Sequence, residues 1–218
     1  MCARRCISVL ALKRRSDINH RQHGCRAPCP AGHACLRHRH EHRLAHRSAA
    51  PLEDGHREPV RYRLEQQAQR GEITPPELWE YARRELNLDA AGFAEFRAQF
   101  FAGDVMDHGL IERIRGLKER YRTGIITNAW IDLRPTLEHT WKIGDAFDAI
   151  VVSAEEGIMK PDVRIYQKAL DALDVEAAQA VFLDDNLANV EGARRHGLSA
   201  IHFSDPALAL SELDRLLA

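Results

Sequence analysis

The stretch VFLDDNLANVEGARRHG, residues 181–197, joins an apolar run to a helical pattern through two adjacent carboxylates. The run predicts a short buried strand, and Gly197 lies where the helix that follows is expected to end. Asp184 and Asp185 repel one another where the strand ends, so placing both there has an energetic cost. A cation that prefers oxygen ligands, such as Mg²⁺, would relieve that repulsion. Alternatively, Asp-Asp-Asn caps the helix and leaves one surplus surface charge.

Outward from this stretch, residues 61–218 alternate short apolar runs with helical patterns. Thr74 opens a capping box, and Pro161 is expected at the start of another helix. The expected strands are 122–127, 146–153, 180–183 and 199–203; the expected helices are 61–71, 77–86, 90–101, 107–119, 133–141, 162–173, 187–197 and one that follows Asp205-Pro206. This alternation predicts an α/β fold with a Rossmann-like, doubly wound parallel sheet.

Polar residues follow three of these strands. They are Thr127-Asn128, Lys160 and Asp184-Asp185. In doubly wound sheets ligands bind beyond the carboxyl ends of the strands, so these side chains are expected to converge. A hydroxyl, a lysine and a carboxylate pair can hold a phosphate beside a divalent cation. Taken singly, however, Thr-Asn is also ordinary turn chemistry, and a lysine before proline is usually solvated.

The first 60 residues have a different character from the rest. They hold all five cysteines, eight of the twelve histidines and a net charge of +7, whereas residues 61–218 carry −8. No period of 2 or 3.6 is sustained in them. Zinc binding by Cys25, Cys29 and Cys35 with nearby histidines is one interpretation, although the spacing fits no standard zinc module. A transit segment, a disordered basic tail and a segment translated out of frame or from a wrong start are the others.

Composition limits the partners. The chain has a net charge of −1 and a pI near 6.9, which gives no general attraction to nucleic acid or membrane. No apolar run approaches the roughly 20 residues that span a bilayer, and we identify no secretory signal. We therefore expect a cytoplasmic protein with neither a nucleic acid nor a membrane as partner. The oligomeric state cannot be derived from the sequence.

The motifs GIITNAW (124–130), EEGIMKPDVRIYQKAL (155–170) and residues 181–197 together resemble the haloacid dehalogenase superfamily of hydrolases. They are most similar to its sugar-phosphatase-like branch, which includes the phosphatase domain of soluble epoxide hydrolases. The resemblance implies a Rossmann-like core over 106–218 and a partial helical cap over 61–105. It also implies hydrolysis of a small phosphorylated metabolite through an aspartyl-phosphate.

The resemblance also implies roles for the phosphate-binding residues and the metal ligands. Thr127 and Asn128 would bind the transferring phosphoryl group, and Lys160 would bridge it to the nucleophile. The metal residues implied are Asp184 as a direct Mg²⁺ ligand, Asp185 for the metal-bound waters and Asn189 as support for that shell. Paired aspartates look like the phosphatase pattern more than that of the dehalogenases, which work without a metal. A metal-independent, dehalogenase-type hydrolase remains an alternative.

One element of the family pattern is missing. The family begins with a strand that ends in a nucleophilic aspartate, expected here near positions 7–17, where the sequence is ISVLALKRRSD. Ile7–Leu12 can imitate the strand, but Ala11, Leu12 and Lys13 occupy the place of the acid, and Asp17 lies five residues too late. Without a carboxylate nucleophile there is no covalent step, so the chain as written is expected to be inactive or crippled.

A reading-frame error upstream of codon 61 explains both the composition of residues 1–60 and the missing acid. The hypothesis is tested by resequencing the gene and translating the other two frames. It fails if neither frame encodes an apolar strand that ends in aspartate. The competing interpretation is a non-catalytic binding protein on the same scaffold.

Overall fold

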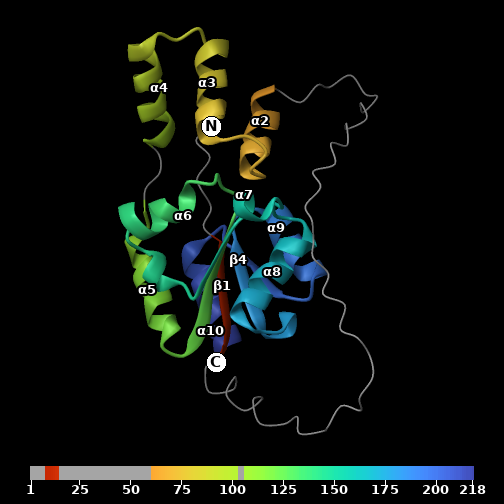
Figure 1. Ribbon diagram of the computed structural model, residues 1–218. Helices are drawn as coiled ribbons and strands as arrows, with labels where there is room; N and C mark the ends of the chain where they lie inside the picture. Colours follow the sequence, from red (N-terminus) through yellow and green to blue (C-terminus); the bar gives the residue numbers. More distant parts are fainter. Residues whose placement is uncertain (1–7, 15–59, 103–105) are drawn as a thin grey trace, which may run out of the picture.

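The structure, a computed structural model, describes residues 8–14, 60–102 and 106–218. A five-stranded sheet with the strand order β3-β2-β1-β4-β5 lies at the centre of the core (Figure 1). Its strands are β1 Ser8–Arg14, β2 Tyr121–Thr127, β3 Ala149–Val152, β4 Ala180–Asp184 and β5 Ser199–His202. The proposed zinc ligands, Asp17 and the rest of residues 15–59 lie outside the described residues.

Helices cover both faces of the sheet, as the doubly wound prediction requires. The helices are α2 Val60–Gln69, α3 Pro75–Glu85, α4 Ala90–Phe101, α5 His108–Lys118, α6 Leu133–Pro135, α7 Ser153–Glu156, α8 Val163–Leu173, α9 Leu187–Arg195 and α10 Pro206–Leu217. Ile126 and Phe182 pack in one cluster with α8 and α9. Their neighbours Ile125 and Val181 face the other side, toward α5 and α10. This alternation follows from the two-residue period of a strand.

The helices α2, α3 and α4 form a cap that stands over one end of the core (Figure 1). The capping box predicted at Thr74 is present: its hydroxyl accepts from the Glu77 N–H, and the Glu77 carboxylate accepts from the Thr74 N–H. Asp89 caps α4 through one bond, in which its side chain accepts from the Gly92 N–H. The helices α3 and α4 therefore begin directly after the N-cap residues that the local sequence provides.

The central strand differs from the expected parallel arrangement. β2 pairs with β3, and β4 with β5, in parallel, but β1 runs antiparallel to both of its neighbours. Ser8 pairs with Ile126 near the carboxyl end of β2, whereas Arg14 pairs with Tyr121 at its start. Ser8–Arg14 thus takes the central position in the sheet, between β2 and β4. The carboxyl end of β1 therefore lies beside the start of β2, at the opposite end of that strand from Thr127.

Two local predictions need correction. Pro161 precedes the helix rather than opening it, because Asp162 is the N-cap of α8. The single helix expected over 133–141 is instead the three-residue α6 followed by a wider π-type turn over Thr136–Thr140. Within the described part of the chain, no helix is long and apolar enough to cross a membrane.

Candidate functional site

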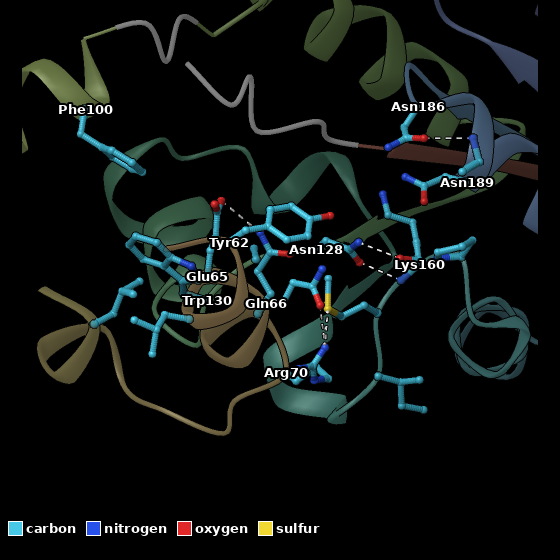
Figure 2. A pocket seen from close by; sticks show the side chains of 18 of the residues that line it. Tyr62, Glu65, Gln66, Arg70, Phe100, Asn128, Trp130, Lys160, Asn186 and Asn189 are labelled. Carbon is cyan, nitrogen blue, oxygen red and sulfur yellow. Dashed lines mark hydrogen bonds between the residues drawn. The ribbon is translucent and has the colours of Figure 1, made fainter. Parts of the chain in front are cut away.

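A cavity of about 1570 Å³ lies between the cap and the carboxyl ends of the parallel strands. Its floor includes Asn128, Lys160, Asp185 and Asn189. Figure 2 shows Asn128 and Lys160 side by side in this pocket. Thr127 and Asp184 are buried beside the floor and do not line the cavity. The residues predicted from three separate strand ends are therefore brought to one edge of the sheet.

Lys160 forms a buried ion pair with Asp184. Its ammonium nitrogen lies 2.9 Å from Asp184 Oδ2 and 3.0 Å from the Ile126 carbonyl oxygen. The two side chains are 2% and 0% exposed. The interpretation of Lys160 as an ordinary solvated lysine is therefore wrong. A buried ammonium is costly to desolvate and is held in place by such partners.

Asn128 ties the end of β2 to the loop that carries Lys160. Its amide nitrogen donates to the Lys160 carbonyl oxygen at 2.9 Å, and its Oδ1 accepts from the Lys160 N–H at 2.8 Å (Figure 2). This paired contact reaches across 32 residues of sequence and is not a local turn. It fixes the position from which the Lys160 side chain enters the core.

Asp184 is oriented by three further hydrogen bonds. Asn189 Nδ2 lies 3.1 Å from each of its two oxygens, and the Asn186 N–H donates to Oδ1 at 2.8 Å. Asn186 is the N-cap of α9, since its side chain accepts from the Ala188 N–H. The asparagine of Asp-Asp-Asn therefore caps the helix, as the alternative interpretation has it, but neither aspartate is the side-chain cap and capping does not explain the buried Asp184.

Asp185 lies in a different environment from Asp184. It is exposed and lines the cavity, and its carbonyl oxygen lies 2.8 Å from the His202 ring nitrogen Nε2. His202, at the end of β5, also lines the cavity. The two adjacent carboxylates thus divide into one buried and fixed by hydrogen bonds and one at the cavity surface.

Tyr166 is a positioning residue that the sequence did not reveal. Its hydroxyl donates to the Asn189 carbonyl oxygen at 2.8 Å, and its side chain is fully buried. Burial, followed by the nearby charge of Asp184, raises the pKa of Tyr166 well above its usual value, so the phenol stays protonated as a donor. In the sequence Tyr166 looks like any apolar core position of an amphipathic helix.

The donor set fits Mg²⁺. Mg²⁺ is commonly held by one or two carboxylates together with water and substrate phosphate oxygens. Asp185 offers such oxygens at the cavity surface, whereas the oxygens of Asp184 are buried and held by Lys160, Asn186 and Asn189. Asn189 orients Asp184 as outer-shell partners orient metal ligands. No group of three or more His, Cys, Asp or Glu suited to a metal occurs among the residues that the structure describes.

Ser153 links the cap to the core. Its Oγ donates to the Gln69 carbonyl oxygen at the end of α2 at 2.6 Å and accepts from the Ala129 N–H at 3.0 Å. Beside it, Gly71 adopts a φ of +70° and lies so close to Ala154 that a Cβ would be 2.3 Å from the Ala154 carbonyl oxygen. Only glycine fits both demands at this cap connection.

We expect Ser153→Ala to lower the free energy of unfolding by about 1–3 kcal/mol, because it leaves the buried Ala129 N–H without its acceptor. Urea unfolding measures the loss. Ser211→Ala, on the exposed face of α10, is the matched control and is expected to change stability by less than about 0.5 kcal/mol. Equal effects of the two substitutions would contradict the role of Ser153 as a link.

The family profile of haloacid dehalogenase-like hydrolases matches residues 20–197. The chain belongs to this family. It is 29% identical over 157 residues to the sesquiterpene phosphatase astK of Aspergillus oryzae, a match that covers 70% of this chain and 78% of that protein. It is 31% identical over 128 residues to the rat bifunctional epoxide hydrolase 2, a match that covers 56% of this chain and 23% of that enzyme.

A solved structure supports the fold. A HAD family enzyme of Bacteroides thetaiotaomicron, crystallised as an aspartate-to-alanine variant with magnesium and inorganic phosphate, superimposes with a TM-score of 0.56 at 20% identity. The superposition covers 62% of this chain and 70% of that one. Fold and relatives together define a phosphatase-like member of the haloacid dehalogenase family, as the motifs predicted.

Proposed function

We propose that the site binds the phosphate group of a small phosphate ester together with Mg²⁺, and that its chemistry is that of a phosphatase. The observation that carries the proposal is that Lys160 lines the cavity floor while its ammonium is held by the buried Asp184. A fixed ammonium beside a cavity attracts an anion, and Asn128 holds its backbone in place. The relatives that are phosphatases by name point to the same chemistry.

Different residues of the chain would bind the phosphate, hold the metal and orient the metal ligand. Lys160 would neutralise charge on the phosphate oxygens, with Thr127 and Asn128 beside it at the end of β2. Asp184 and Asp185 would hold Mg²⁺, which polarises the phosphate ester when bound. Asn189 keeps the Asp184 carboxylate in one orientation. These roles are proposals from geometry and from the family resemblance.

The covalent step is where we propose that this chain departs from its family. β1, with the sequence SVLALKR, contains no acidic residue, and its carboxyl end lies at the opposite edge of the sheet from Lys160. Within its seven described residues, β1 therefore brings no carboxylate nucleophile to the cavity floor. We therefore propose that the chain as written binds phosphate and Mg²⁺ without hydrolysing the ester. The magnesium and phosphate complex of the aspartate-to-alanine neighbour is a precedent for such a state.

The test combines titration calorimetry with a turnover assay. Inorganic phosphate is expected to bind to the full chain more tightly with Mg²⁺ than without it, and p-nitrophenyl phosphate is expected to stay intact. Lys160→Ala should weaken phosphate binding about 10-fold or more, because it removes a charge-assisted hydrogen bond to the phosphate. Lys168→Ala, which removes an exposed lysine of α8, should leave it unchanged. Absence of phosphate binding would refute the proposal, and turnover abolished by Lys160→Ala would refute its non-hydrolytic part.

A further inference from the structure

An aromatic wall continues from the phosphate site into the cap. We define it by Trp79, Phe96, Phe100 and Trp130, all of which line the cavity. Trp130 follows Asn128 by two residues, so the wall begins next to the polar floor. Figure 2 shows Phe100 and Trp130 on one side of the pocket and Asn128 and Lys160 on the other.

The wall joins both parts of the protein through ring contacts. The Trp130 ring stacks on Phe100 at 6.1 Å between centroids and meets Trp79 edge-on at 5.4 Å. Trp79 in turn contacts Phe96 and Phe100. Because Trp130 belongs to the core and the other three to the cap, these contacts fix the wall relative to Lys160. Aromatic groups in such offset and edge-to-face arrangements pack favourably.

The α4 part of the wall is accessible, whereas Trp130 is 6% exposed and forms the buried base of the wall. Four of the twelve residues of α4 are phenylalanines, yet no residue of this helix is buried. Phe100 is 37% exposed. Leu78 and Ala82 of α3 and Leu86 at its C-cap extend the same apolar lining. A cavity with a charged floor and an apolar wall is complementary to a ligand that has a charged group at one end and an apolar group at the other.

The part of the lining that comes from α2 and its C-terminal turn is less suited to bind a sugar. Its polar side chains hydrogen-bond one another. Arg70 donates to Glu72 at 2.7 Å and to Gln66 at 3.3 Å, and Gln69 donates to Glu65 at 3.5 Å. These side chains already use part of their hydrogen-bonding capacity on one another, whereas a hydrocarbon on the aromatic wall needs no such partner.

We infer that the site takes phosphate monoesters of apolar alcohols, with the phosphate on Lys160 and the hydrocarbon chain on the aromatic wall. The inference rests on the proposed function and narrows its substrate class. It is narrower than the small phosphorylated metabolite that the family resemblance implies. The cavity volume leaves ample room beyond a phosphate group for a hydrocarbon chain.

The experiment is a calorimetric series with Mg²⁺ and inorganic phosphate, ethyl, butyl and hexyl phosphate, glucose 6-phosphate and 1-hexanol. Affinity is expected to rise by up to about fourfold per methylene, the conversion of about 0.8 kcal/mol for each buried CH₂. Hexyl phosphate should therefore bind about 10-fold or more tightly than ethyl phosphate. Glucose 6-phosphate should bind no better than inorganic phosphate.

Variants on one helix supply the matched control. Phe100→Ala and Phe96→Ala should remove most of the gain of hexyl over ethyl phosphate and leave binding of inorganic phosphate intact. Phe93→Ala is the control, because Phe93 also contacts Trp79, at 6.2 Å, but does not line the cavity. Circular dichroism of each variant confirms that it is folded.

The outcomes separate the two proposals. Equal affinity for ethyl and hexyl phosphate, with phosphate binding preserved, overturns the substrate class and leaves the proposed function standing. Binding of 1-hexanol as tight as that of hexyl phosphate identifies the wall as a docking surface for another apolar partner and also overturns the inference. Failure of every phosphate compound to bind overturns both proposals.

Discussion

Lys160→Met is expected to lower the free energy of unfolding by about 3–5 kcal/mol, because it leaves the Asp184 carboxylate buried without its ammonium partner. Hydrogen bonds from Asn189 and from the Asn186 N–H remain, but they do not replace a positive charge. Denaturant unfolding at neutral pH measures the loss. The effect is large because both side chains are almost fully shielded from water.

Two controls define what the Lys160 result means. The double variant Lys160→Met/Asp184→Asn should recover most of the lost stability, because it removes both charges. The amide introduced at position 184 can still pair with Asn189. Lys168→Met breaks an exposed ion pair with Glu156 and should cost less than about 1 kcal/mol. If the double variant is less stable than Lys160→Met, the unpaired charge is not the cause.

Gly192→Ala is expected to destabilise the protein by about 1–3 kcal/mol through overpacking between α9 and the Lys160 loop. A Cβ at this position would lie 2.8 Å from Pro161 Cβ, 2.9 Å from the Pro161 carbonyl oxygen and 3.0 Å from the Tyr166 hydroxyl. Two of these atoms belong to the residue next to Lys160. We therefore also expect phosphate affinity to fall, measured by calorimetry beside urea unfolding.

Gly116→Ala is the matched control. Gly116 also lies within a helix, α5, but nothing approaches within 4 Å of its added Cβ. Replacing a helical glycine by alanine at an open position should raise stability by roughly 0.5–1 kcal/mol, because alanine has less backbone freedom to lose on folding. Opposite signs for the two substitutions are the expected result. A neutral or stabilising Gly192→Ala would contradict the close packing at Pro161.

Helices and strands of residues 61–218 could be predicted well because their signals are local. The capping box at Thr74, the cap at Asp89 and the glycine after α9 each act within a few residues. The prediction of one helix over 133–141 was wrong where tertiary packing sets the backbone conformation. Leu133 and Leu137 are both buried in the cluster that includes Ile125 and Val152 of β2 and β3. The α7 turn at Ser153 carried no comparable local signal.

The candidate site was only partly predictable for the same reason. The positions Asn128, Lys160 and Asp184 follow strands, and the strand-end rule places such residues at one edge. The sequence could not show that Lys160 is buried against Asp184, or that Thr127 stays out of the cavity. The aromatic wall was missed because phenylalanines on α4 look like ordinary core positions of a helix.

The sequence by itself determined the family, the order of the elements, the strand ends that form the site and the absence of an acid in the first strand. Only the tertiary structure decided the direction of β1, the split between a buried and an exposed aspartate, and the seating of Trp130 against the cap. The first set depends on residue types and on spacing along the chain. The second depends on which distant segments pack together, because burial and strand pairing are settled only when they meet.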